Sequence, residues 1–160
     1  MTGYRENASP QSNELTKLAW FEKPMRWSQL TLVEDDPLTI DCDFWLDYFR
    51  RIKSDAVCLS AGGYMAFYPT EIPYHYKSKY LGDSDPFGYL VEGCRKLGMV
   101  VIARTDPHAI HDDAFRAHPE WAMIDVDGNP RKHWAMPGVW LTCTLGTYCF
   151  EFMTKVNREI

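Results

Sequence analysis

The sequence predicts an α/β fold: the first three βα units of a (β/α)8 or TIM barrel, with long loops after the strands. Residues 99–103 (Met-Val-Val-Ile-Ala) form a continuous apolar run, which is typical of a parallel strand buried on both faces. Such runs alternate with amphipathic helical segments, the order expected for a parallel sheet covered by helices. A closed barrel needs eight strands and about 250 residues, so 160 residues can hold only part of one.

The chain is expected to begin with an arm that precedes the folded part. Residues 1–26 are polar and irregular, so they predict an N-terminal arm ahead of one domain at residues 27–160. The first strand is expected at residues 30–33 (Leu-Thr-Leu-Val), because the run is apolar and β-branched. An acidic run at residues 34–36 follows it, which gives this strand an acidic carboxyl end.

A helix is expected directly after this acidic end. Asp41 can cap it, because a carboxylate before the first turn accepts a free backbone N–H. Arg50 and Arg51 suit its last turn, where the helix dipole favours positive charge. The apolar side chains of this segment recur on one helical face and predict an amphipathic helix: Phe44, Trp45, Tyr48, Phe49 and Ile52.

The second βα unit repeats this order. A buried strand is expected at residues 56–61 (Ala-Val-Cys-Leu-Ser-Ala), ending in the glycines at 62–63, where backbone or ligand can approach closely. A long aromatic loop at 64–84 leads to Asp85 and Pro86, which suit the cap and the first turn of a second helix. Its apolar face comprises Phe87, Leu90, Val91, Cys94 and Leu97.

The region after the third strand is less regular. Residues 112–117 predict a short helix, and residues 121–134 predict a hairpin that turns at 127–129 (Asp-Gly-Asn). Residues 139–145 are expected to be extended. Residues 148–160 have helical periodicity and predict the third helix.

Composition excludes several classes of function. The formal charge of −5 and the absence of a Lys/Arg run argue against binding to nucleic acid or to an anionic membrane. No segment approaches the roughly 18 apolar residues of a membrane span. The N-terminus lacks the apolar core of a secretory signal, so a cytoplasmic protein is expected.

The sequence also predicts no cofactor. The five cysteines lack CxxC spacing, so we expect reduced and mostly buried thiols rather than disulfides or a structural zinc site. The glycines at 62–63 lack the further Gly or Lys of a phosphate-binding loop, and no G-x-S-x-G elbow is present.

The candidate site lies at the ends of the three expected strands, because the loops after parallel strands meet at one edge of the sheet. Asp106 and Glu34 are the candidate catalytic groups, since paired carboxylates suit acid/base or nucleophilic chemistry. An alternative is that residues 34–36 form a solvated loop and helix-capping cluster, and that Arg104 only pairs with Asp106 or with an acid of the first strand. Asp106 could likewise only start a turn with Pro107. The expected substrate-binding residues are Glu34, Asp35, Asp36, Tyr64, Arg104, Asp106, His108 and Trp140.

Aromatic residues near the strand ends suggest a sugar as the ligand, because a sugar stacks its C–H face on a ring while its hydroxyls form hydrogen bonds. The alternative is that Trp140 and the aromatic loop at 64–84 pack against the rim of the fold. His108 and His111 have metal-ligand chemistry and would share one face of a helix. No second ligand cluster accompanies them in the sequence, so no metal site is predicted.

Several segments together resemble the hypothetical glycosyl hydrolase 6 family, a group of barrel proteins related to α-L-fucosidases and β-galactosidases. The resemblance extends over residues 27–160. It is carried by W-x-Q-L-T-L-V-E-D-D-P at 27–37, D-F-W-L-D-Y-F-R-R at 43–51, C-L-S-A-G-G-Y at 58–64, D-P-F-G-Y-L-V-E-G-C-R-K-L-G-M-V-V-I-A-R-T-D-P-H at 85–108 and A-H-P-E-W at 117–121.

This resemblance implies the N-terminal part of a longer glycoside hydrolase that takes a carbohydrate substrate and can form a homo-oligomer. It places the catalytic carboxyl pair in later strands, so the residues here are expected to contact substrate and the isolated chain to be inactive. The motif at 147–149, Thr-Tyr-Cys, departs from the Pro-Tyr-Asn of the family. Two alternatives stay open: a non-catalytic carbohydrate-binding remnant, or a metal-dependent barrel hydrolase that uses His108 and His111.

Overall fold

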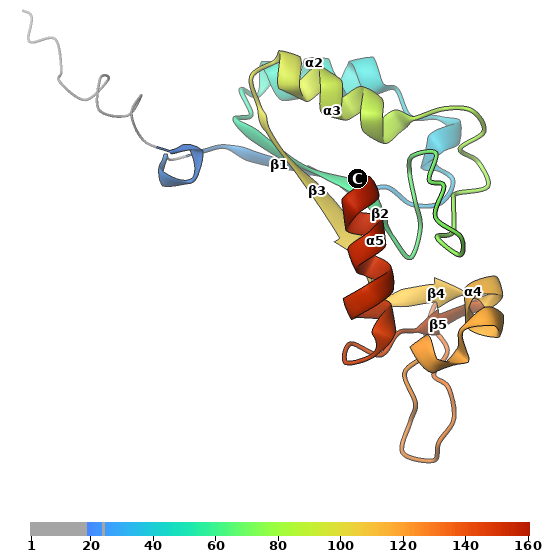
Figure 1. Cartoon of the computed structure of the whole chain (residues 1–160). Coiled ribbons are helices and arrows are strands. Elements are labelled where there is room, and N and C mark those ends of the chain that lie inside the picture. Colours follow the sequence, from blue (N-terminus) through green and yellow to red (C-terminus); the bar gives the residue numbers. More distant parts are fainter. Residues whose placement is uncertain (1–18, 24) are drawn as a thin grey trace, which may run out of the picture.

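The computed structural model describes residues 19–23 and 25–160, so most of the predicted N-terminal arm lies outside the described residues. The chain is a mixed α/β protein whose main sheet has three parallel strands in the order β1-β2-β3 (Figure 1). These strands are β1 (Trp27–Leu30), β2 (Ala56–Gly63) and β3 (Val100–Asp106).

The central strand β2 is the most deeply buried part of the sheet. Seven of its eight residues are buried. The third strand is different, because within the described chain it pairs on one side only, with β2. Ile102 of β3 is 40% exposed, so the prediction that residues 99–103 are buried on both faces is wrong for this chain.

The first strand lies earlier in the sequence than predicted. It pairs with β2 from Trp27 to Leu30, not over residues 30–33. The change occurs at Leu32, whose backbone N–H donates to Oγ of Ser60 at 3.1 Å. The hydroxyl of Ser60 therefore accepts the N–H that would otherwise bond to the backbone of the neighbouring strand. Leu32 itself stays buried.

Helices α2 (Cys42–Arg51) and α3 (Pro86–Lys96) lie together over one face of this sheet (Figure 1). Both predicted caps are confirmed. Asp41 accepts the N–H of Phe44 at 2.8 Å, and Asp85 accepts the N–H of Gly88 at 2.8 Å. A Cβ atom on Gly88 would lie 2.3 Å from the Asp85 carboxylate, so the absence of a side chain there gives this cap its space.

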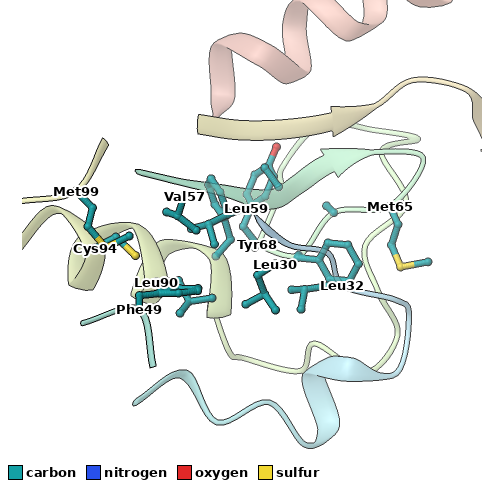
Figure 2. Packing of buried hydrophobic residues seen from close by; sticks show 14 residues of the cluster. Leu30, Leu32, Phe49, Val57, Leu59, Met65, Tyr68, Leu90, Cys94 and Met99 are labelled. Atoms are coloured by element: carbon teal, nitrogen blue, oxygen red, sulfur yellow. The ribbon is translucent and has the colours of Figure 1, made fainter. Parts of the chain in front are cut away.

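The first hydrophobic core fills the space between the sheet and these helices (Figure 2). Phe49 of α2 and Leu90 of α3 are each 1% exposed and pack among side chains of β1 and β2. The predicted apolar face of α2 is only partly buried, because Phe44, Tyr48 and Ile52 are 50%, 39% and 41% exposed. These three lie on the side of α2 that no described element covers.

The segment after β3, residues 107–147, forms an insertion with its own small sheet. Strands β4 (Ala109–His111) and β5 (Val139–Leu141) pair antiparallel, and β4 was not predicted. Helix α4 (Asp112–Ala117) confirms the predicted short helix, and the 3-10 turn η3 (Pro119–Trp121) follows it. The predicted hairpin contains only isolated bridges such as that of Ile124 with Pro130.

The last helical segment begins with a π-helical turn, η4 (Tyr148–Phe152), and continues as α5 (Met153–Glu159), which confirms the predicted third helix. Its apolar side packs against the insertion. None of the helices within residues 19–23 and 25–160 has the length and apolar character that a membrane crossing requires. The contact between the last helical segment and the insertion forms a second hydrophobic core, which contains Ile110, Ala114, Trp121, Tyr148, Phe152, Met153 and Val156.

The cysteines are less buried than predicted. All five are free, but only Cys94 is fully buried, in the first core; Cys42, Cys58, Cys143 and Cys149 are half-buried.

Candidate functional site

The candidate site is built where the carboxyl ends of the three parallel strands meet. The end of β2 is tied to the end of β3, because the N–H of Tyr64 donates to the carbonyl of Asp106 at 2.8 Å. Gly63 makes this contact possible. Its φ is +111°, and a Cβ atom there would lie 2.3 Å from the backbone of Asp106. Only glycine fits this position without displacing Asp106.

Glu34 follows strand β1 in the chain and is bonded to residues of the aromatic loop at 64–84. The hydroxyl of Tyr76 donates to Oε1 of Glu34 at 2.6 Å, and Nζ of Lys79 lies 3.9 Å from the same oxygen. The hydroxyl of Ser78 donates to the Glu34 carbonyl at 2.6 Å. Burial and the Glu34 contact raise the pKa of Tyr76 to about 12, so its proton stays in this bond.

Arg104 and Asp106 form an ion pair on β3. The guanidinium donates to Oδ1 of Asp106 at 2.9 Å and to Oγ1 of Thr31 at 3.0 Å. Both charged side chains are about two-thirds buried or more, at 33% and 26% exposed. The pairing alternative for Arg104 is therefore the one the structure shows. Asp106 therefore accepts a charge-assisted hydrogen bond from the Arg104 guanidinium within the fold.

Tyr64 lies at the centre of the ring contacts. Its ring centroid is 5.2 Å from that of His108 and 6.3 Å from that of His111. Burial raises the pKa of Tyr64, with further effects from Asp106, Arg104 and Glu34. The backbone N–H of Tyr64 is bonded to the Asp106 carbonyl, so this phenol ring lies where the ends of β2 and β3 meet.

His111 is a polar group in an apolar position. Its ring stacks on Tyr76 with centroids 3.6 Å apart. Its Nε2 atom is buried and has no hydrogen-bond partner among the described residues. Burial lowers the pKa of His111, so the neutral ring is favoured. His111 belongs to β4, so the two histidines do not share the face of a helix.

We call the seven residues gathered here the strand-end cluster. It joins five predicted site residues to Tyr76 and His111, which come from the aromatic loop and from β4. Sequence patterns cannot show that these two segments fold back over the strand ends. The cluster comprises Glu34, Tyr64, Tyr76, Arg104, Asp106, His108 and His111.

Three predicted substrate contacts lie outside this cluster. Asp35 is exposed and makes no side-chain cap bond to the turn η2 (Asp36–Leu38), and Asp36 accepts the N–H of Val33 at 2.6 Å, in the residues before that turn. Trp140 donates through Nε1 to Asp112 at 2.6 Å and stacks on Phe115 at 3.9 Å. Its indole is thus used for packing within the insertion.

Another aromatic pair, which the predicted site did not include, lies beside His108. The ring of His133 is 5.8 Å from that of His108, and Trp134 stacks on His133 at 3.9 Å. Trp134 is 79% exposed. The N–H groups of Ala135 and Met136 donate to Nδ1 of His133 at 3.2 and 3.1 Å, so the neutral ring carries its proton on Nε2.

A chain of hydrogen bonds through His75 holds the end of β2. The N–H of Gly63 donates to Nε2 of His75 at 3.2 Å, so the proton of this neutral imidazole is on Nδ1, which lies 3.0 Å from Oγ1 of Thr70. Thr70 in turn donates to Glu159 of α5 at 2.5 Å. Burial lowers the pKa of His75 to about 4. This chain of hydrogen bonds joins the sheet, the aromatic loop and the last helix.

The sequence model of the hypothetical glycosyl hydrolase 6 family matches residues 41–160 of this chain. The chain belongs to that family. The matched region of this family member contains Tyr64, Arg104, Asp106 and His108, whereas Glu34 lies outside it. None of the curated proteins matches the chain.

Solved structures support the fold of this family member. An alpha-L-fucosidase isoenzyme 2 from Paenibacillus thiaminolyticus superposes with a TM-score of 0.59 and 17% identity, covering 84% of this chain and 21% of the fucosidase. An alpha-amylase from Lactobacillus plantarum gives 0.54 and 17%, covering 83% and 35%. The chain therefore spans about a fifth and about a third of these two proteins.

The described residues of this family member offer no ligand set for the metal-dependent alternative. Among the described residues, no three or more His, Cys, Asp or Glu side chains are grouped so that they could hold a metal ion. His108 contacts the rings of Tyr64 and His133, and His111 stacks on Tyr76.

Proposed function

We propose that this chain is part of a glycoside hydrolase, that its sheet forms the first units of a (β/α)8 barrel, and that the strand-end cluster binds the saccharide. One observation carries the proposal: the ring of Tyr64 lies 5.2 Å from that of His108, and its backbone N–H donates to Asp106, whose carboxylate pairs with a guanidinium. A ring for the C–H face and polar groups for the hydroxyls are what a sugar site requires.

The cluster is suited to holding a sugar rather than to proton transfer. Asp106 is paired with Arg104, and Glu34 accepts from Tyr76 with Lys79 nearby. Both carboxylates are therefore already engaged by donors of the fold, which fixes their positions for hydrogen bonding to a ligand. We therefore propose that Glu34 and Asp106 accept hydrogen bonds from sugar hydroxyls, and that the acid/base pair for glycoside cleavage belongs to another part of a longer protein.

Binding can be tested by isothermal titration of the chain with L-fucose, D-galactose and maltose. We expect Asp106→Asn and Glu34→Gln each to weaken binding about tenfold, since each loses a charge-assisted hydrogen bond. Asp127→Asn is the matched control, because Asp127 is exposed in the turn of the insertion. An absence of heat with every sugar, or equal loss in the control, contradicts the proposal.

Hydrolysis is tested separately with nitrophenyl glycosides of the same sugars. We expect no turnover by the 160-residue chain, because the proposal assigns it a binding wall and not the carboxyl pair. A rate abolished by Asp106→Asn would show instead that the strand-end cluster performs the chemistry itself.

A further inference from the structure

A hollow in the described structure lies away from the strand-end cluster. Its volume is about 470 Å³, which is within the usual range for small-molecule sites. Three segments form its walls: the aromatic loop around Tyr74, the turn η3 with His118, Glu120 and Trp121, and the helical segment that carries Glu151. We call this hollow the Tyr74 pocket. It shares no lining residue with the strand-end cluster.

Aromatic rings form one side of the pocket. Trp121 is 7% exposed and stacks on His118 with centroids 4.0 Å apart. The edge of Tyr74 meets His118 at 5.2 Å, and Tyr74 itself is 45% exposed. These three rings form one layer, and its outermost member, Tyr74, is partly exposed to solvent.

The backbone of Tyr74 is strained. Its φ is +65°, a left-handed conformation that is unfavourable for a residue with a Cβ atom. Glycine or asparagine would adopt it more readily, yet the chain presents a large aromatic ring there. Such outliers occur at ligand sites, where the surrounding structure fixes a side chain in a needed place.

The polar groups of the pocket have both signs of charge. Glu120 is engaged with His118, whose Nδ1 lies 3.0 Å from its Oε1. Glu151 and Lys155 also line the pocket, and neither has an ion-pair partner within 4.0 Å among residues 19–23 and 25–160. The pocket that Tyr74 lines therefore also presents a carboxylate and an ammonium with no ion-pair partner among the described residues.

We propose that the Tyr74 pocket is a second saccharide-binding site. A neutral polyol suits it, because its hydroxyls donate to Glu151 and accept from Lys155 while a C–H face packs on Tyr74. An anion would meet two carboxylates, and a cation would meet the ammonium of Lys155. The site lies apart from the strand-end cluster, so it goes beyond the function proposed above and does not rest on it.

The test is titration of the ¹⁵N-labelled chain with maltose, D-galactose and L-fucose, followed by amide shifts. We expect at least one sugar to shift the amides of Tyr74, Glu151 and Lys155. Tyr74→Asn should weaken this binding at least tenfold, because asparagine tolerates the backbone but removes the ring. Glu151→Gln, an exposed change that leaves the core intact, should weaken it about threefold. Tyr89→Ala, an exposed tyrosine on α3, is the control and should change nothing.

Two further arms separate this site from the other one. Glu34→Gln should leave the shifts at Tyr74 unchanged, even where it abolishes those at Tyr64. Butylammonium and acetate probe the charged alternatives. The proposal is overturned if no sugar shifts the Tyr74 pocket, if Tyr74→Asn and Glu151→Gln both bind as the unaltered chain does, or if either ion binds there more tightly than the sugars.

Discussion

The sheet with its two helices and the insertion after β3 are held together in different ways. In the first, regular elements bury aliphatic side chains against one another, as with Leu59 of β2 and Leu90 of α3. In the second, β4 and β5 have three residues each, too few to be stable alone. Stacked rings replace strand length there: Trp121 lies 4.7 Å from Phe152 and 5.3 Å from Tyr148.

This difference shows how the candidate site is constructed. Parallel strands bring polar side chains to one edge, but they leave that edge open to solvent. The insertion and the aromatic loop, built on aromatic packing, add His111 and Tyr76 above it. His75 is linked through Thr70 to Glu159 of α5, and α5 packs on the insertion, so the geometry of the site depends on both regions.

The largest expected effect lies in the first core. Phe49→Ala removes a side chain that is 1% exposed, and we expect the free energy of unfolding to fall by about 3–5 kcal/mol. Urea titration followed by far-UV circular dichroism measures it. Phe44→Ala in the same helix is the control, because Phe44 is 50% exposed. A similar loss in both variants would mean that the sheet region does not depend on this core.

The junction between the ends of β2 and β3 is tested by Gly63→Ala. The new Cβ atom would meet the backbone of Asp106 at 2.3 Å in a left-handed conformation, and we expect a loss of about 2–5 kcal/mol. Gly82→Ala is the matched control: its φ is +56°, with no atom within 4 Å of the added carbon. Gly82→Ala should lower the free energy of unfolding only by the cost of the left-handed backbone, about 1–2 kcal/mol. Equal losses in urea titration would exclude the steric contact.

Acid should weaken the same junction through His75. Its pKa falls from 6.5 to about 4 on folding, so the unfolded chain binds more protons between these values. The contribution of His75 to the free energy of unfolding is therefore present in full above pH 6.5. It is lost as the pH falls towards 4, by about 3 kcal/mol in total.

Urea titrations at pH 7.5 and pH 4.5 measure this decline. His75→Gln keeps an oxygen that can accept the N–H of Gly63 but does not titrate, so it should show a shallower pH dependence. His111, whose pKa is also lowered by burial, adds a smaller effect of the same sign in both proteins. An identical slope in the variant would show that His75 is not responsible.

The smallest expected effect concerns the insertion. Tyr148 is 1% exposed, and its hydroxyl donates to the Ala109 carbonyl at 3.4 Å. Tyr148→Phe keeps the ring stack and loses this bond, so the cost should be about 1 kcal/mol. Amide hydrogen exchange should show the loss in β4 and β5, with α3 unchanged. A larger effect in α3 would mean that the two regions unfold as one unit.

The fold of the first region could be predicted because each element has a local signal. Asp41 and Asp85 mark helix starts that the structure confirms, and the apolar run at 56–61 became the buried centre of β2. Strand boundaries were less predictable: β1 ends at Leu30 because the Ser60 side chain takes the N–H of Leu32. No local pattern records a bond between residues so distant in sequence.

The site was predictable only in part for the same reason. Arg104 and Asp106 follow a recognisable strand and do lie at its end, and Tyr64 lies beside them. Trp140 has the same aromatic signal as Trp134, yet one is packed against Phe115 and the other is exposed near His108. Residue type alone does not distinguish a ring used for packing from a ring available to a ligand.

The sequence by itself determined the α/β order, the caps, the parallel strands and the polar strand ends, because these depend on periodicity and on contacts a few residues apart. It also pointed to the family to which the chain belongs. Only the tertiary structure decided that β3 is exposed at Ile102, that His111 lies on a strand, and that Tyr76 closes on Glu34. Those outcomes depend on which distant segments pack together, and packing is a property of the whole folded chain.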